Sequence, residues 1–290
     1  MERAYPGILD QLSRGRPVRL ESVSGGCIAK AQIATFADGG SVFVKCVAAA
    51  TDMFEREAEG LEALAAANAI RVPSVLAADR TALVLERIGQ GAAGPGFFES
   101  FGQKFARLHR HRGAACGFEH DNYIGSTRQV NRPLPDAPGD GSDWPGFFLD
   151  RRLRFQARLA AKNGHGETLL RLLDACEDRF NELLCDAIEP ACILHGDLWG
   201  GNFIADEAGE PCLIDPAVYF GHREADLAMT RLFGGFGPAF YAAYEAEYPL
   251  AAGQEERLQM YQLYHLLNHL NLFGGGYCGQ CKQFLQYYSK

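Results

Sequence analysis

The sequence predicts an α+β fold with two lobes, in which a small antiparallel sheet with one helix precedes a larger, mainly helical part. Segments of alternating polarity joined by glycine turns dominate residues 18–47, and helical periodicity dominates from Phe97 onward. A chain of 290 residues is long enough for two lobes that share a cleft. We expect the small lobe to span residues 1–88 and the large lobe residues 89–290.

The small lobe is predicted from its turns and its residue types. Three strands are expected at residues 18–24, 28–36 and 41–47, because glycine-containing turns separate them. Apolar residues at helical spacing predict a helix over residues 54–67, and the apolar run at 82–86 predicts a strand buried on both faces. Residues 89–96 are rich in Gly and Ala without a period, which indicates a hinge.

The large lobe is predicted to be mainly helical. Helical periodicity is found over residues 97–110, 146–162, 167–185, 223–233, 238–247 and 255–273. Residues 128–144 are polar and rich in Pro and Gly, which predicts a long loop.

Composition excludes several classes of partner. The formal net charge of −8 argues against nucleic acid or an anionic membrane, since both attract basic surfaces. No apolar run approaches the ~18 residues of a membrane span, and the start of the chain lacks the apolar core of a signal peptide, so a cytoplasmic protein is expected. Most of the nine cysteines should then be reduced thiols. Cys278 and Cys281 form a C-x-x-C without a second ligand pair, which favours incidental thiols over zinc.

Two strings of residues carry chemistry. Residues 195–202 read His-Gly-Asp-Leu-Trp-Gly-Gly-Asn, and Asp215 follows a second apolar run. Asp197 is the candidate base, while Asn202 and Asp215 are candidate ligands of Mg²⁺. This set suits phosphoryl transfer from ATP to a hydroxyl group. His195 is expected to fix the shape of the loop rather than to act as the base.

A glycine-rich segment in the small lobe is a weaker signal. Backbone N–H groups around Gly25 and Gly26 could cradle phosphates, although a plain hairpin turn explains the same residues. A lysine inside an apolar strand is costly unless it is paired, so Lys45 is expected to pair with an acid on the next helix. Glu57 is preferred over Glu59 because it lies beside the apolar stripe.

Together these strings resemble the fructosamine (ketosamine) kinase family, relatives of aminoglycoside and choline kinases with a protein-kinase-like fold. The resemblance runs through the whole chain, and its most specific part is the string at residues 195–202. Further matching pieces are Ser24-Gly25-Gly26-Cys27-Ile28, Val42-Phe43-Val44-Lys45, Trp144-Pro145, Asp215-Pro216-Ala217, Phe233-Gly234-Gly235-Phe236 and Asn268-His269.

The resemblance implies an ATP- and Mg²⁺-dependent kinase that phosphorylates the sugar of small or protein-bound ketosamines, a step of deglycation repair. It implies Asp197 as the base, with Asn202 and Asp215 on Mg²⁺. It also implies Lys45 and Glu57 as the pair that positions the phosphates. Glu86 falls at the family's hinge, whose backbone would bind adenine.

Several assignments stay open. Glu224 and Asp226 either cap a helix or brace a loop, or they bind substrate. Trp199 is either a stacking surface for the sugar or a core residue. Cys27 is either an unreactive thiol or a redox-sensitive one in the phosphate loop.

Sequence alone also leaves the acceptor and the assembly open. Alternative acceptors are an aminoglycoside, choline or a small sugar, and a nucleotide-binding pseudokinase is the alternative of a different class. Fructosamine and ribulosamine are not distinguished, nor are a monomer and a homodimer. Trp144 is expected in the core or a lid, and residues 120–122 in a polar loop.

Overall fold

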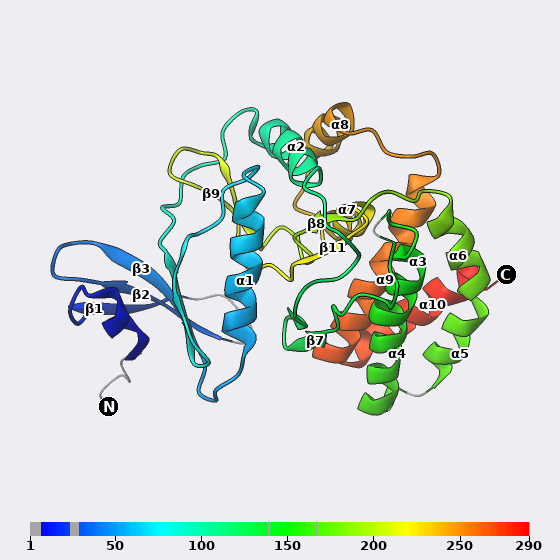
Figure 1. Ribbon diagram of the computed structural model, residues 1–290, viewed down its shortest axis with the longest axis horizontal. Coiled ribbons are helices and arrows are strands. Elements are labelled where there is room, and N and C mark those ends of the chain that lie inside the picture. Colours follow the sequence, from blue (N-terminus) through cyan, green and yellow to red (C-terminus); the bar gives the residue numbers. More distant parts are fainter. Residues whose placement is uncertain (1–6, 24–28, 139, 166, 290) are drawn as a thin grey trace.

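The computed structural model describes residues 7–23, 29–138, 140–165 and 167–289. A small lobe built from one sheet and helix α1 lies beside a larger helical lobe (Figure 1). The sheet has the strand order β1-β2-β3-β5-β4, and neighbouring strands are antiparallel. Its strands are β1 (Arg19–Val23), β2 (Lys30–Thr35), β3 (Ser41–Cys46), β4 (Val75–Ala78) and β5 (Ala82–Glu86).

Both faces of this sheet are covered. Helix α1 (Met53–Ala66) packs Phe54 and Leu61 against Leu83 and Leu85 of β5. A short 3-10 helix, Gly7–Leu12, covers the other face, where its apolar side chains meet those of β3 and β5. This two-sided burial is why β5 is apolar along its length, and it confirms the prediction for residues 82–86.

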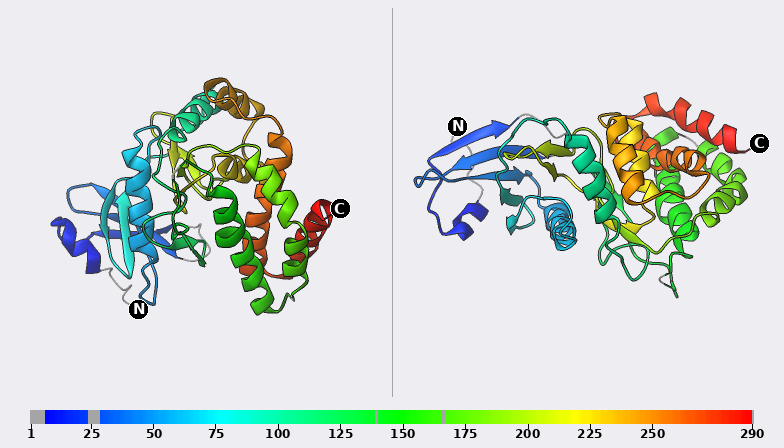
Figure 2. Two further views of the ribbon diagram at one scale, coloured as in Figure 1. Left: turned by 45° about the vertical axis from the view of Figure 1, so that its right-hand side comes forward. Right: turned by 90° about the horizontal axis from the view of Figure 1, so that it is seen from above.

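The helical lobe begins with α2 (Phe97–Leu108), reached through residues 87–96 (Figure 2). Short strands form three antiparallel pairs: β6 (Asn122–Ile124) with β7 (Thr127–Gln129), β8 (Cys192–Leu194) with β11 (Tyr219–Gly221), and β9 (Phe203–Ala205) with β10 (Pro211–Leu213).

Helix α9 (Gln254–Phe273) is buried along most of its length and packs against several other helices. The other helices are α3 (Trp144–Phe147), α4 (Phe155–Ala160), α5 (Thr168–Ala175), α6 (Glu177–Cys185), α7 (Glu224–Leu232), α8 (Pro238–Glu247) and α10 (Cys278–Tyr288). Helical turns over Phe148–Arg154 and Ala161–His165 extend α4 at both ends, and Gly275–Tyr277 forms a 3-10 turn before α10. Within the described residues, no helix is long and apolar enough to cross a bilayer.

The predicted strands and helices of both lobes are found, with a few differences. The helix predicted at residues 167–185 is interrupted at Cys176, which separates α5 from α6. The loop predicted at residues 128–144 begins inside β7. The sequence missed α10, β4 and most strands of three residues. The missed strands are too short to carry a recognisable period.

Candidate active site

The loop that carries Asp197 lies between β8 and β9, against the segment that follows Asp215. The N–H of Ala217 donates to the carbonyl of His195 at 2.8 Å. Gly196 has φ +81°, and a Cβ atom there would lie 2.0 Å from the carbonyl oxygen of Ala217. Only glycine fits this close approach and this dihedral.

His195 holds the shape of the loop. Its side chain is buried, and its Nδ1 accepts the N–H of Asp197 at 3.2 Å. Since Nδ1 is an acceptor, Nε2 carries the proton and donates to the carbonyl of Ile214 at 3.0 Å. Burial lowers the pKa of His195, which keeps the ring neutral. The predicted structural role of this histidine is confirmed.

Asp197 has few partners for its charge. The amide Nδ2 of Asn202 donates to the carbonyl oxygen of Asp197 at 2.8 Å and to its Oδ2 at 3.3 Å. Burial raises the pKa of Asp197 well above its usual value, and the negative charges of Asp215 and Asp226 add to this effect. A carboxylate with a raised pKa takes up a proton more readily, which suits a general base.

Lys45, Glu57 and Asp215 form an ionic group at the boundary between the lobes, in which Lys45 and Glu57 are largely buried and the side chain of Asp215 is 44% exposed. The Nζ atom of Lys45, on β3, lies 2.6 Å from Oε1 of Glu57 on α1 and 2.6 Å from Oδ1 of Asp215. Burial opposes the positive charge, but the two carboxylates outweigh it and raise the pKa of Lys45. The expected pairing with Glu57 is present, whereas Glu59 binds Arg56 at 2.6 Å.

Asn202 and Asp215 are neighbours, and within the described residues each has a side-chain oxygen without a hydrogen-bond partner that a cation could use. The carbonyl of Asn202 accepts the N–H of Ile214 at 3.0 Å, and its Nδ2 lies 3.4 Å from the carbonyl of Asp215. Because Nδ2 points into the loop, the oxygen of the amide is the atom left for a cation. Asp215 has φ +53°, an uncommon conformation for a non-glycine residue that aims its carboxylate toward Lys45.

This donor set matches Mg²⁺ bound together with phosphate. Magnesium is commonly held by one or two carboxylates plus substrate phosphate oxygens, rather than by a cage made of protein alone. Among the described residues, no group of three or more His, Cys, Asp or Glu side chains is placed to hold a metal ion. One amide and one carboxylate therefore fit an ion whose coordination is completed by phosphate oxygens.

These residues line one cavity of about 1100 Å³ between the lobes. Its wall includes Lys45, Asp197, Asn202, Asp215, the apolar side chains Ile33, Phe43, Leu85, Ile204 and Ile214, and the segment from Glu86 to Gln90. Trp199, His269 and Phe273 also line it, and Trp199 is 40% exposed. Gly25, Gly26 and Cys27 lie outside the described residues.

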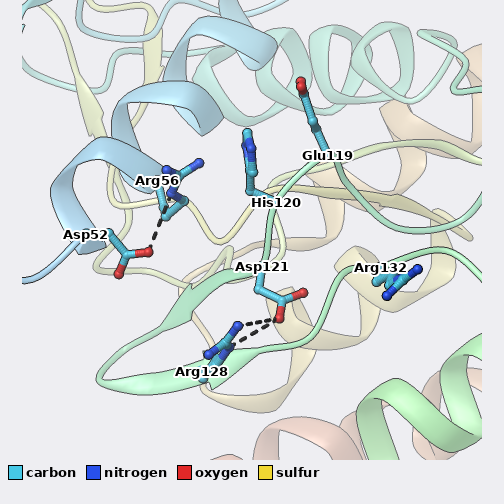
Figure 3. A pocket seen from close by; sticks show the side chains of 7 residues that line it. All are labelled: Asp52, Arg56, Glu119, His120, Asp121, Arg128 and Arg132. Atoms are coloured by element: carbon cyan, nitrogen blue, oxygen red, sulfur yellow. Dashed lines mark hydrogen bonds and ion pairs between the residues drawn. The ribbon is translucent and has the colours of Figure 1, made fainter.

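A second hollow, of about 400 Å³, lies near the start of α1. Charged side chains line it, and several of them pair with one another: Arg128 with Asp121 at 2.9 Å, and Arg56 with Asp52 at 3.7 Å (Figure 3). His120 belongs to this hollow. Residues 120 and 121 lie in a loop, as predicted for residues 120–122. Asn122 instead begins β6, where it is buried and donates to the carbonyl of Val218 at 2.7 Å.

Comparison with known proteins decides the family. A family model described as "Fructosamine kinase" matches residues 8–290. The "Probable ketoamine kinase" of Synechocystis sp. is 40% identical over 291 residues, which cover 96% of this chain and 95% of the relative. The chain belongs to the fructosamine kinase family. It is also 40% identical to the chloroplastic protein-ribulosamine 3-kinase of Arabidopsis thaliana, over 89% of this chain and 79% of that one.

Solved structures agree with this family and its fold. The crystal structure of a "putative fructosamine-3-kinase" from Thermobifida fusca matches with a TM-score of 0.86 and 30% identity, over 97% of this chain and 98% of that one. Aminoglycoside phosphotransferase APH(4)-Ia, solved with ADP and hygromycin B, matches with a TM-score of 0.65 at 13% identity over 98% and 97% of the two chains. This second likeness concerns the fold alone, and it confirms the predicted kinase-like architecture.

In this member of the fructosamine kinase family, Asp226 braces the loop of residues 195–202 and does not line the cavity. Its side chain is 1% exposed and accepts the N–H groups of His195 at 2.7 Å and Gly196 at 2.8 Å, while Nε2 of His109 lies 3.3 Å away. Burial opposes its ionisation, but these hydrogen bonds outweigh it and lower the pKa of Asp226. The suggested role in substrate binding is therefore wrong for this residue, and the loop-bracing alternative fits.

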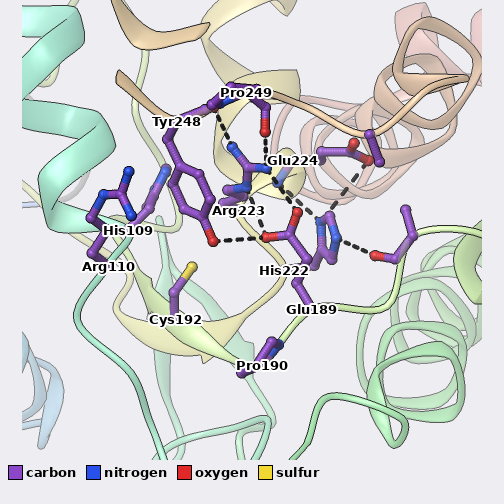
Figure 4. A network of polar contacts seen from close by, with 12 residues as sticks. His109, Arg110, Glu189, Pro190, Cys192, His222, Arg223, Glu224, Tyr248 and Pro249 are labelled. Atoms are coloured by element: carbon purple, nitrogen blue, oxygen red, sulfur yellow. Dashed lines mark hydrogen bonds and ion pairs between the residues drawn. The ribbon is translucent and has the colours of Figure 1, made fainter. Parts of the chain in front are cut away.

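Glu224 is likewise part of the protein interior. It is fully buried, and its two oxygens accept from Nε and Nη2 of Arg257, each at 2.8 Å. The neighbouring Arg223 bonds to both oxygens of Glu189 and to the carbonyl of Tyr248, so the start of α7 is fixed from several sides (Figure 4). The suggestion that Glu224 binds substrate is also wrong, because its carboxylate is already occupied.

Other residues of the site were not found from the sequence. His109 supports Asp226, and Arg71 binds Glu86, Asp206 and Glu207. No sequence signal indicates either one, because their partners are more than a dozen residues away. Asp206, in the turn between β9 and β10, is 4% exposed and paired with Arg71. Trp144 was predicted to lie in the core or a lid, and it is a core residue. Its Nε1–H donates to the hydroxyl of Tyr261 at 2.8 Å.

Proposed function

We propose that this chain transfers a phosphoryl group from ATP to a sugar hydroxyl of ketosamines, in the manner its family name describes. One observation carries the proposal: a carboxylate with a raised pKa, Asp197, lies in the same cavity as Lys45, Asn202 and Asp215. The relatives named ketoamine kinase and protein-ribulosamine 3-kinase support the acceptor class, including ketosamines carried by proteins.

Each residue has a defined task in this proposal. Asp197 accepts the proton of the attacking sugar hydroxyl. Lys45, held by Glu57, contacts the phosphates of ATP as a fixed positive charge. Asn202 and Asp215 would hold Mg²⁺, which would neutralise the charge of the triphosphate. Lys45 would then exchange its contact with Asp215 for one with phosphate.

The remaining assignments concern recognition. We assign nucleotide binding to residues 1–88, with Gly25 and Gly26 at the phosphates and the backbone after Glu86 at adenine. Residues 89–290 then supply catalysis and the acceptor site. Trp199 is partly exposed on the cavity wall, where an indole face can stack on a sugar. Oxidation of Cys27 would obstruct the phosphate site.

The test is ATP consumption with a panel of acceptors by the wild type and by Asp197→Asn. The panel holds fructosyl- and ribulosyl-amines, choline and a kanamycin-type aminoglycoside. Turnover with the ketosamines alone, lost in Asp197→Asn, is expected. Turnover only with choline or the aminoglycoside would contradict the acceptor class, and ADP binding without any turnover would indicate a pseudokinase. The same preparation, measured by sedimentation, gives the oligomeric state; localisation in the cytoplasm stays a prediction.

A further inference from the structure

Arg71 lies between α1 and β4, where the small lobe meets the helical lobe. Its backbone forms an isolated parallel bridge with Cys212, and its carbonyl accepts the N–H of Leu213 at 2.9 Å. Cys212 and Leu213 belong to β10, the strand that leads to Asp215. The backbone of Arg71 is therefore attached to the element that positions a candidate metal ligand.

The side chain of Arg71 connects three carboxylates from the two lobes. Its Nη2 donates to Oε1 of Glu86 at 2.7 Å, and its Nη1 donates to Oδ2 of Asp206 at 2.7 Å and to Oε1 of Glu207 at 3.0 Å. Glu86 ends β5 in the small lobe, whereas Asp206 and Glu207 form the turn between β9 and β10. The planar guanidinium fixes the direction of each of these bonds.

Two of these carboxylates are also held through their second oxygen. Oε2 of Glu86 accepts the N–H of Ser74 at 3.1 Å and its hydroxyl at 3.2 Å. Oδ1 of Asp206 accepts the N–H groups of Ala208 and Glu210, each at 2.9 Å. Neither carboxylate can rotate to follow a displaced arginine without losing these bonds, so the contact is geometrically specific.

The segment that follows β5 rests directly on the same hairpin. The N–H of Gly91 donates to the carbonyl of Ala205 at 3.0 Å, and a Cβ atom on Gly91 would lie 2.1 Å from the carbonyl oxygen of Asp206. Both ends of the segment from Glu86 to Gly91 are thus tied to the β9–β10 hairpin, at one end through Arg71. Between these ends, Arg87, Ile88 and Gln90 line the cavity together with Glu86.

The apolar part of the cavity has walls from these same elements. Ile33, Phe43 and Leu85 are partners across β2, β3 and β5, so they lie side by side on one face of the sheet. Ile204 of β9 and Ile214 after β10 supply apolar surface from the hairpin. The separation of these two surfaces depends on how the end of β5 is joined to the hairpin.

We infer that Arg71 is a positioning residue for the nucleotide: it joins the end of β5 to the β9–β10 hairpin and so sets the width of the slot that receives the base. Arg71 itself does not line the cavity and acts through Glu86 and the hairpin. The inference rests on the proposed function, because it requires an adenine nucleotide in this cavity.

The test compares ADP binding with Mg²⁺, by calorimetry, in the wild type, Arg71→Met and Arg71→Lys. We expect ADP affinity to fall about tenfold in Arg71→Met and less in Arg71→Lys, since a looser slot loses preorganisation. The KM for ATP should rise in parallel, while the KM for the ketosamine changes by less than about twofold. This split between the two substrates would not follow from a general loss of stability.

Arg154→Met is the matched control. Arg154 also contacts three carboxylates, those of Asp150, Asp174 and Glu177, and it is 20% exposed against 32% for Arg71. It belongs to the helical lobe, outside the cavity wall. Its loss should lower the melting temperature without changing ADP affinity.

Unchanged ADP affinity in folded Arg71→Met, or an equal loss in Arg154→Met, would overturn the inference. If Arg71→Met does not fold, Arg71→Lys decides by the same criterion. A wild type that binds ADP but phosphorylates no ketosamine would refute the proposed function, and the ADP comparison would still decide the role of Arg71.

Discussion

Replacing Asp226 by Asn tests whether this carboxylate holds the loop of residues 195–202 in place. The substitution keeps the size of the side chain but removes its charge and one of its two acceptor oxygens. The N–H of His195 lies 2.7 Å from Oδ2 and that of Gly196 lies 2.8 Å from Oδ1. An asparagine can accept one of these N–H groups, and its own NH₂ group must then face the other.

The expected cost follows from these contacts. A buried N–H without a partner costs about 1–3 kcal/mol, and replacing a charge-assisted bond by a neutral one adds about 1 kcal/mol. We therefore expect Asp226→Asn to lower the free energy of unfolding by about 2–4 kcal/mol. For a chain of this size that corresponds to a melting temperature lower by about 4–8 °C. The kcat should fall as well, because Asp197 directly follows the released backbone.

Thermal unfolding and steady-state kinetics check this expectation. Asp178→Asn is the control, because Asp178 also lies in the first turn of a helix but is exposed. If Asp226 acted only as a charge at the start of α7, both substitutions would cost about the same, at most ~1 kcal/mol. A melting temperature for Asp226→Asn within about 2 °C of the wild type, with unchanged kcat, would refute the loop-bracing role.

Four further outcomes are expected. Burial raises the pKa of Asp197, so kcat/KM should fall as pH drops through a pKa above the usual carboxyl range, as a pH profile would show. The raised pKa also means that the buried charge of Asp197 destabilises the protein at neutral pH. Asp197→Asn should therefore raise the melting temperature while abolishing turnover, and a melting temperature below that of the wild type would contradict this. Trp199→Ala should raise the KM for ketosamine at least about fivefold and leave the KM for ATP nearly unchanged, with Trp199→Phe as the milder control; equal effects on both would exclude a sugar contact. Gly196→Ala should lower the free energy of unfolding by more than about 2 kcal/mol in thermal unfolding, because its Cβ would lie 2.0 Å from a carbonyl oxygen. Gly164→Ala is the control, since Gly164 has a similar φ but its Cβ would meet no neighbouring atom.

Much of the fold follows from patterns that the sequence displays locally. Alternation predicts the strands of the small lobe, and helical spacing predicts α1, α2, α7, α8 and α9. Most strands of three or four residues were missed because their stability comes from tertiary pairing. Strand β11, for example, exists because Phe220 pairs with Ile193, which is 27 positions away in the chain. Such pairing leaves no periodic trace in either segment.

Site residues were predictable from the sequence where a short string of residues has one evident chemical use. Asp197 and Asn202 share a loop, and Lys45 is an unusual residue in an apolar strand. The acids of α7 were ambiguous, since the sequence cannot tell whether a carboxylate at a helix start meets solvent, substrate or backbone. The contacts of Asp226 with His195 and Gly196 decide this, and they depend on how α7 packs below the loop. Arg71 was overlooked because its partners, too, come from distant parts of the chain.

Asp197 in the loop and Asp226 on α7 show how one residue type acquires two roles. Asp226 receives two backbone N–H groups and a histidine, which lower its pKa and keep it ionised. Asp197 receives one weak side-chain contact from Asn202 at 3.3 Å, and burial raises its pKa. Because Asp226 holds the loop, Asp197 does not have to. Within the described part of the chain its carboxylate has only the contact with Asn202, and its pKa stays raised. A donor supplied to Asp197 would stabilise the loop but lower the pKa that the proposed base needs, so the two tasks fall to two residues.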